Sequence, residues 1–221
     1  MTSPGSAALE GYVLVVPIGA TEQHGPHLPL TTDSDVADAL AAQLTDRAPR
    51  VVLAPTMPYG ASDEHRDFPG TLSIGTDLTT QMLLQLGRSA ARSWPRVLFL
   101  NAHGGNATAL RLATALLRIE GLDVRAWSPQ WPGDAHAGHT ETSVMLFLRG
   151  SDVQFREAAP GAQQPLSALL PRLKTTGVAA VSANGVLGDP TTASAAAGER
   201  LLAQAVSQLL EFLADWRREA A

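Results

Sequence analysis

The chain has 221 residues, of which 45% are apolar and 17% charged, enough for one globular domain with a substantial core. Its net charge of −5 and lack of a basic patch argue against a nucleic-acid partner, and no apolar run approaches the ~20 residues of a membrane span. Without cysteine it has neither disulfides nor thiolate metal ligands, which is compatible with the cytoplasm. We therefore expect one cytoplasmic domain over residues 1–221, with residues 1–10 flexible.

Apolar, β-branched runs alternate with helical periodicity along most of the chain. The predicted strands are 12–18, 51–54, 96–101 and 123–128. The predicted helices are 33–47, with Asp33 or Ser34 as its N-cap, then 77–94, 106–119, 140–148 and 190–216. Between residues 150 and 188 the pattern is weaker, with short candidate elements at 165–173 and 178–181. The alternation predicts an α/β fold, a three-layer α/β/α sandwich around a mostly parallel sheet.

Histidines and carboxylates follow two of the predicted strands. Glu22 and His24 come after the first strand, and an i, i+2 pair in extended backbone projects to one side. Asp33 follows after a turn, and His103 closes the third strand. Open α/β sheets build their active sites at such strand ends. Nitrogen and oxygen ligands without thiolates suit zinc, iron or manganese, so the pattern favours one or two divalent ions.

Further candidate site residues lie near these positions in the sequence. For each of them there is also an explanation that requires no role in the site. Gly104 and Gly105 bring backbone amides close to a ligand at His103, as a phosphate-binding loop also does. Glu141 begins a predicted helix, where an acid is favourable for the helix dipole alone. His136 precedes it by five residues and is a natural proton donor or acceptor beside a metal, or else a solvated loop histidine.

Four segments resemble the creatininase family, in the right order along the chain. They are 16–30 with Asp33, His65 with 68–73, 101–106, and 136–138 with 141–143. The resemblance implies a creatininase-like fold, and ring-like homo-oligomers are usual in the family. It also implies metal ligands at Glu22, His24, Asp33 and His103, with Asp33 bridging two ions. Creatininase has a glutamate where this chain has Gly105, so the second metal lacks a ligand unless Glu141 supplies one. A single-metal site stays open.

Segments 133–138 and 183–190 resemble one branch of that family, which acts in the biosynthesis of the redox cofactor mycofactocin. Its members are metal-dependent peptidases whose substrate is the radical-modified precursor peptide. They cleave near its C-terminus and release the modified Val-Tyr unit. Two rival functions stay open, a small-molecule cyclic amidohydrolase of the creatininase or deformylase type and a non-catalytic metal-binding scaffold.

The implied mechanism is attack on an amide carbonyl by a water that the metal activates. Glu141 and His136 are expected at the catalytic centre, with His136 donating a proton to the leaving nitrogen. A backbone amide of Gly104 or Gly105 is expected to stabilise the oxyanion. Candidates for the substrate wall are His65, in the long loop 55–76, and the aromatic pair Trp127 and Trp131, for which ordinary packing is the alternative.

Overall fold

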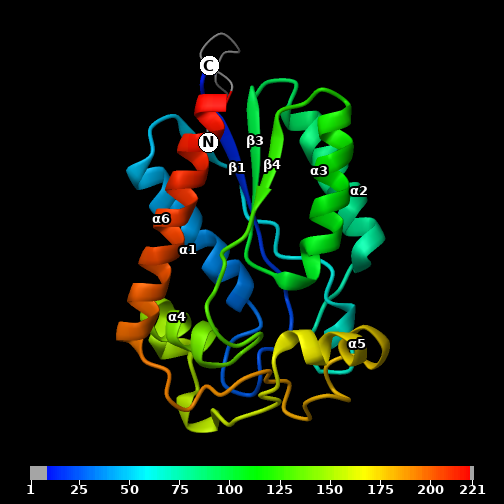
Figure 1. Cartoon of the computed structure of the whole chain (residues 1–221), viewed down its shortest axis with the longest axis vertical. Coiled ribbons are helices and arrows are strands. Elements are labelled where there is room, and N and C mark those ends of the chain that lie inside the picture. Colours follow the sequence, from blue (N-terminus) through cyan, green and yellow to red (C-terminus); the bar gives the residue numbers. More distant parts are fainter. Residues whose placement is uncertain (1–8, 220–221) are drawn as a thin grey trace.

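The computed structural model describes residues 9–219 and is built around four parallel strands in the order β2-β1-β3-β4. The strands are β1 (Val13–Ile18), β2 (Val51–Leu53), β3 (Arg96–Asn101) and β4 (Val124–Trp127). The helices are α1 (Thr32–Arg47), α2 (Gly75–Ala90), α3 (Ala107–Ile119), α4 (His139–Arg149), α5 (Leu166–Thr176) and α6 (Ala195–Glu219). Helices α1 and α6 cover one face of the sheet and α2 and α3 the other, whereas α4 and α5 lie beyond one end (Figure 1). The predicted α/β/α sandwich is confirmed.

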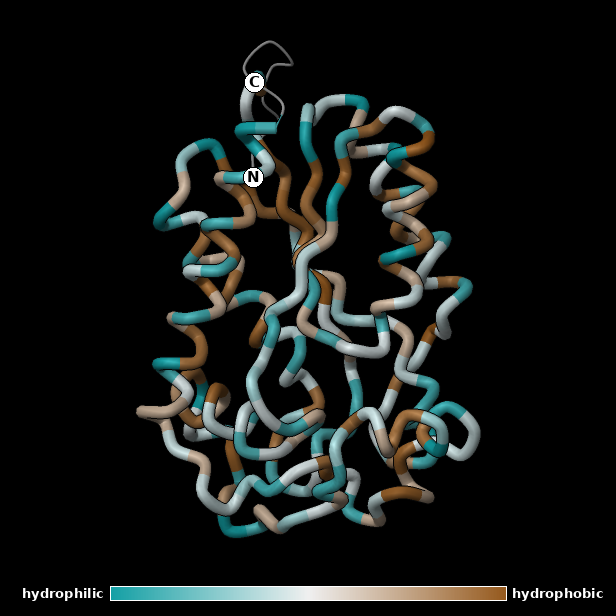
Figure 2. The backbone as a smooth tube through the Cα atoms, in the orientation of Figure 1, coloured by the Kyte–Doolittle hydropathy of each residue, from teal (hydrophilic) through white to brown (hydrophobic). Residues whose placement is uncertain are grey.

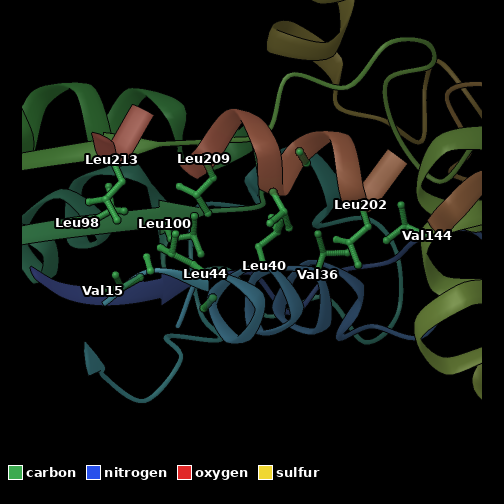
Figure 3. Packing of buried hydrophobic residues seen from close by; sticks show 14 of the residues in the cluster. Val15, Val36, Leu40, Leu44, Leu98, Leu100, Val144, Leu202, Leu209 and Leu213 are labelled. Atoms are coloured by element: carbon green, nitrogen blue, oxygen red, sulfur yellow. The ribbon is translucent and has the colours of Figure 1, made fainter. Parts of the chain in front are cut away.

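Side chains alternate along the central strands between the two helical layers. Val15 of β1, with Leu98 and Leu100 of β3, belongs to the cluster that includes residues of α1, α4 and α6. Figure 3 shows this side, where the two β3 leucines face Leu209 and Leu213 of α6. The intervening strand residues belong to a second cluster with α2 and α3. A strand buried on both faces needs apolar residues at every position, which explains the unbroken hydrophobic runs in the sequence (Figure 2).

Four local predictions differ from the structure. Helix α2 ends at Ala90 and not at residue 94, because residues 91–93 form turns. Helix α1 begins at Thr32, and Asp33 lies in its first turn without capping it, because its carboxylate turns toward two histidines. Helix α6 begins at Ala195 instead of residue 190, because the Asp189 carboxylate holds the backbone of Thr191 in a turn. The candidate at 178–181 consists of turns, whereas the one at 165–173 corresponds to α5.

Much of the predicted flexible stretch, residues 1–8, lies outside the described residues. Leu9 is buried, and its carbonyl oxygen accepts a hydrogen bond from the amide of Tyr12. In the described part of the chain no helix has the length and apolarity to cross a membrane. All four strands run in the same direction, so the loops after β1 and β3 emerge at the same edge of the sheet, toward α4 and α5 (Figure 1).

The sheet core predicts a clear contrast between two truncations. Leu98→Ala removes a fully buried side chain from β3 and leaves a cavity, so we expect it to lower the free energy of unfolding by about 2–5 kcal/mol. Ile119→Ala, at an 81% exposed position ending α3, should change it by no more than ~0.5 kcal/mol. Urea denaturation of both variants measures the difference, and equal effects would contradict this description of the core.

Candidate metal centre

Acidic and histidine side chains from four segments meet beyond the carboxyl ends of β1 and β3. Glu22 and His24 lie in the loop after β1, Asp33 in the first turn of α1, His103 directly after β3, and Glu141 in the first turn of α4. The first four are at most 4% exposed. Carboxylates and imidazoles are rarely buried so fully unless they are paired or bind a metal. The structure thus brings all five predicted metal-binding residues together.

Asp33 lies between two histidines, one at each carboxylate oxygen. Its Oδ1 is 3.3 Å from His24 Nε2, and its Oδ2 is 3.1 Å from His103 Nδ1. Glu141 Oε2 lies 3.8 Å from His24 Nε2, and Glu22 Oε2 lies 3.3 Å from His103 Nε2. The cluster therefore has two halves that share Asp33, one with His24 and Glu141 and the other with His103 and Glu22. Groups of potential ligand atoms thus lie on both sides of the Asp33 carboxylate, where they would hold one or two divalent ions.

Backbone carbonyls determine which nitrogen of each imidazole is free to bind a cation. His24 Nδ1 lies 3.1 Å from the carbonyl oxygen of Glu22, and His103 Nε2 lies 2.8 Å from that of Ala61. A carbonyl oxygen only accepts hydrogen bonds, so these nitrogens carry the protons. In the neutral rings that bind metal, His24 Nε2 and His103 Nδ1 therefore have the lone pairs, and both nitrogens face Asp33. Metal-binding histidines are commonly oriented in this way by a hydrogen bond from the second ring nitrogen.

Several of the facing atoms lack any other partner. Both carboxylate oxygens of Glu22, Oδ2 of Asp33 and Nε2 of His24 are shielded from solvent and have no hydrogen bond within residues 9–219. Unpaired buried polar groups are costly, and lone pairs about 3 Å apart repel one another. A divalent cation removes both problems, and these donor types suit zinc, manganese or iron. The residues present therefore fit a metal centre.

The charge balance of the cluster leads to the same conclusion. Burial raises the pKa of Glu22 to about 8. Burial opposes a charge on His24, but the carboxylates of Asp33, Glu141 and Glu22 together outweigh it and raise the pKa of His24 to about 10. The pKa of His103 also lies well above its usual value, because Glu22 and Asp33 outweigh burial. As long as no cation is bound, these side chains hold protons in its place, and metal binding displaces such protons.

Two further histidines border the cluster. His136 Nδ1 lies 3.7 Å and His65 Nε2 lies 3.5 Å from Oε1 of Glu22. Burial, assisted by the charge of His24, holds the pKa of His136 well below its usual value and lowers that of His65 to about 3, so both rings are neutral. His65, predicted only as a substrate contact, therefore lies at the centre itself. Groups of three potential ligand atoms also include His136.

Two residues of the loop after β1 were not predicted from the sequence as part of the site. Gln23 contacts both His65 and His136, and His27 Nε2 lies 2.8 Å from the hydroxyl of Thr142 in α4. The signal for Gln23 was its place between Glu22 and His24. Only the tertiary fold shows that its side-chain nitrogen reaches His65 and His136, two rings that also lie beside Glu22.

The predicted glycine and tryptophan contacts have different surroundings. A side chain at Gly105 would collide with the carbonyl oxygen of Ala61 and lie 2.6 Å from Oε1 of Glu64, so position 105 has no room for a metal-binding side chain. Gly104 is exposed, with open space around its α-carbon. Trp127 and Trp131 are half-buried and pack against the cluster that includes residues of α1 and α6. That Trp127 and Trp131 line the substrate-binding site remains a prediction.

Comparison with known proteins agrees with this geometry. A family model described as "Creatininase: Creatinine amidohydrolase" matches residues 1–213. The chain belongs to the creatininase family. A mycofactocin precursor peptide peptidase of Mycolicibacterium smegmatis is 50% identical over 212 residues, covering 93% of this chain and 85% of that protein. A protein of the same description from Mycobacterium tuberculosis is 49% identical over 214 residues, covering 92% and 85%. Such relatives identify this family member as a hydrolase of amide bonds.

Solved creatininases share the fold. A crystal structure of creatinine amidohydrolase superposes with a TM-score of 0.78 at 27% identity, covering 95% of this chain and 92% of the other. A creatininase variant described as Zn-Zn type gives 0.78 at 26% identity, and one described as creatininase Mn gives 0.75 at 25%, both with that same coverage. These creatininases are thus zinc or manganese proteins, and the chain has a buried histidine–carboxylate cluster with ligands suited to such ions.

The unpartnered cluster predicts that divalent metal stabilises the protein. At 100 times its dissociation constant, zinc or manganese should add about 2.7 kcal/mol to the free energy of unfolding and raise Tm. Asp33→Asn should reduce bound metal and abolish most of this rise, because the carboxylate faces both halves of the cluster. Asp38→Asn, at an exposed position on the same helix, is the matched control. Elemental analysis and thermal unfolding measure both effects, and full metal occupancy in Asp33→Asn would exclude the bridge.

Proposed function

We propose that the chain is a metal-dependent peptidase acting on the radical-modified mycofactocin precursor peptide, from which it releases the modified C-terminal Val-Tyr unit. The observation that supports this most is 50% identity, over 93% of the chain, to a mycofactocin precursor peptide peptidase. The buried cluster supplies the means of hydrolysis. One or two zinc, iron or manganese ions would be held by Glu22, His24, Asp33 and His103, with Glu141 as the carboxylate that position 105 does not supply.

The reaction adds water across a peptide bond. When bound, the metal acidifies water and polarises the scissile carbonyl group. Glu22 and Asp33 would hold the cation, and hydrogen bonds to backbone carbonyls keep His24 and His103 oriented toward it. His136 accepts the proton of the attacking water at Nδ1 and transfers it to the leaving nitrogen as the carbon–nitrogen bond breaks. The products are a carboxylate and an amine.

A second candidate is hydrolysis of a small cyclic amide, which the similarity to creatinine amidohydrolases favours. The metal centre does not separate the two substrates, because both reactions need the same chemistry. The 50% identity to a peptidase, against 27% to the Pseudomonas putida creatinine amidohydrolase, favours the peptide. A cytoplasmic location, a homo-oligomeric state and the absence of a nucleic-acid partner remain predictions.

The substrate proposal predicts a rate difference between two peptides. We expect the modified precursor to be cleaved much faster than the same peptide without modification, because a remodelled C-terminal pair offers an aromatic ring and an altered backbone to recognise. Mass spectrometry under identical metal loading follows release of a fragment about two residues in size. Equal rates would show that the enzyme recognises the amino-acid sequence of the peptide and not its modification. Creatinine turnover at a comparable rate would favour the cyclic amide instead.

The proton-transfer role predicts that His136→Ala keeps its metal but loses activity. Its site-facing nitrogen is needed for transfer, so kcat should fall on the order of 10²-fold or more. His139→Ala is the matched control, a histidine three residues on that is only half-buried. Kinetics and elemental analysis are measured together. Loss of metal in His136→Ala would make His136 a ligand, and unchanged turnover would exclude it from the chemistry.

A further inference from the structure

We propose that Gln23 is a positioning residue that sets His65 and His136 in complementary tautomers, so that His65 presents an N–H to the reacting group and His136 presents a lone pair. His65 is then the donor that stabilises the oxyanion, while His136 moves the proton. The oxyanion role rests on the proposed amide hydrolysis, whereas the tautomers follow from the hydrogen bonds alone.

The orientation of the Gln23 amide is fixed at both ends. Its Oε1 accepts a hydrogen bond from the backbone amide of Gly25 at 2.8 Å, and its Nε2 donates to the carbonyl oxygen of Gly185 at 3.1 Å. The second Nε2 hydrogen points to Nδ1 of His65, 2.7 Å away. An amide nitrogen only donates, so His65 Nδ1 is the acceptor and the proton of this ring sits on Nε2. That N–H faces Glu22 Oε1 at 3.5 Å.

His136 has the same protonated nitrogen but presents the opposite side of its ring. Its Nε2 lies 2.9 Å from the backbone carbonyl oxygen of Gln23 and therefore carries the proton. The Gln23 side-chain nitrogen is also within 3.1 Å of it, but both hydrogens of that nitrogen are already used. Nδ1 of His136 is left with a lone pair, 3.7 Å from Glu22 Oε1.

One residue thus directs two rings at one point. The ring centroids of His65 and His136 are 4.4 Å apart, and both face the same oxygen of Glu22. A donor and an acceptor side by side are what hydrolysis needs, one for the developing oxyanion and the other for the proton of water. His65 stays protonated at Nε2 throughout, so it stabilises charge without a net proton transfer.

The Asn184-Gly185 turn, whose role the proposed function leaves open, supports Gln23. Gly185 has a φ of +79°, and a side chain there would collide with Oε1 of Gln23. The backbone of Gln23 is held as well, because its amide donates to the hydroxyl of Thr71 at 3.1 Å. Two loops distant in sequence thus hold this glutamine, one at its side chain and the other at its backbone.

The direct test is nitrogen NMR of the histidine rings in the zinc-loaded protein. In the wild type, long-range proton–nitrogen spectra should show His65 protonated at Nε2 with Nδ1 free. Gln23→Glu replaces the donor by an acceptor, so His65 should change to the Nδ1–H tautomer while the zinc content stays the same. Gln163→Glu, the same substitution at an exposed position, is the control and should leave the His65 signals unchanged. A wild-type His65 protonated at Nδ1 would overturn the proposal.

Kinetics tests the consequence for catalysis. His65→Leu should lower kcat for the modified peptide about 10²-fold, with KM changed little, because the donor acts in the transition state. His65→Gln, which can still offer an N–H, should recover part of the loss, and Gln23→Glu should resemble His65→Leu. Undiminished kcat in metal-loaded His65→Leu would remove the oxyanion role. If the wild type fails to cleave the peptide, the proposed substrate is wrong, whereas the NMR result still decides the tautomers.

Discussion

The Asp33 carboxylate, enclosed with its neighbours and facing a ring nitrogen at each oxygen, is the constraint on which the rest of the site depends. Its own Oδ2, both carboxylate oxygens of Glu22 and Nε2 of His24 are buried without a hydrogen bond in the described part of the chain. Such an arrangement destabilises the fold unless positive charge occupies it. Protons on His24 and His103 supply part of that charge, and a divalent ion supplies it fully.

The scaffold holds this arrangement mainly through backbone groups. Carbonyl oxygens of Glu22, Ala61 and Gln23 each bind the outer nitrogen of one histidine. On the side of α4, the carboxylate of Glu141 accepts a hydrogen bond from the amide of Ala137 at 2.6 Å. Ala137 has a φ of +52°, a conformation that costs energy for a residue other than glycine. The strained loop thus places His136 and Glu141 on the same cluster, which links local backbone strain to the proposed chemistry.

The sequence predicted the layers and much of the site because both follow from local patterns. Runs buried on both faces identified β1 and β3, and polar side chains directly after them identified His24 and His103 as neighbours in space. The role of Asp33 was ambiguous, because an acid at the start of a helix can either cap the helix or bind a metal. Gln23 and the central position of His65 were beyond such reasoning, since they depend on loops that approach only after folding. The sequence shows that Gly105 replaces the glutamate of creatininase. Only the structure shows that Ala61 and Glu64 occupy the space beside this glycine.

Anomalous X-ray diffraction from crystals loaded with zinc or manganese tests the central claim most directly. We predict two peaks roughly 3.5–4 Å apart, as in two-metal hydrolytic sites, one on each side of the Asp33 carboxylate. One peak should contact Nε2 of His24 and Glu141, and the other Nδ1 of His103 and Glu22. A fully loaded crystal with its metal elsewhere, or with Asp33 outside the coordination sphere, would contradict the account.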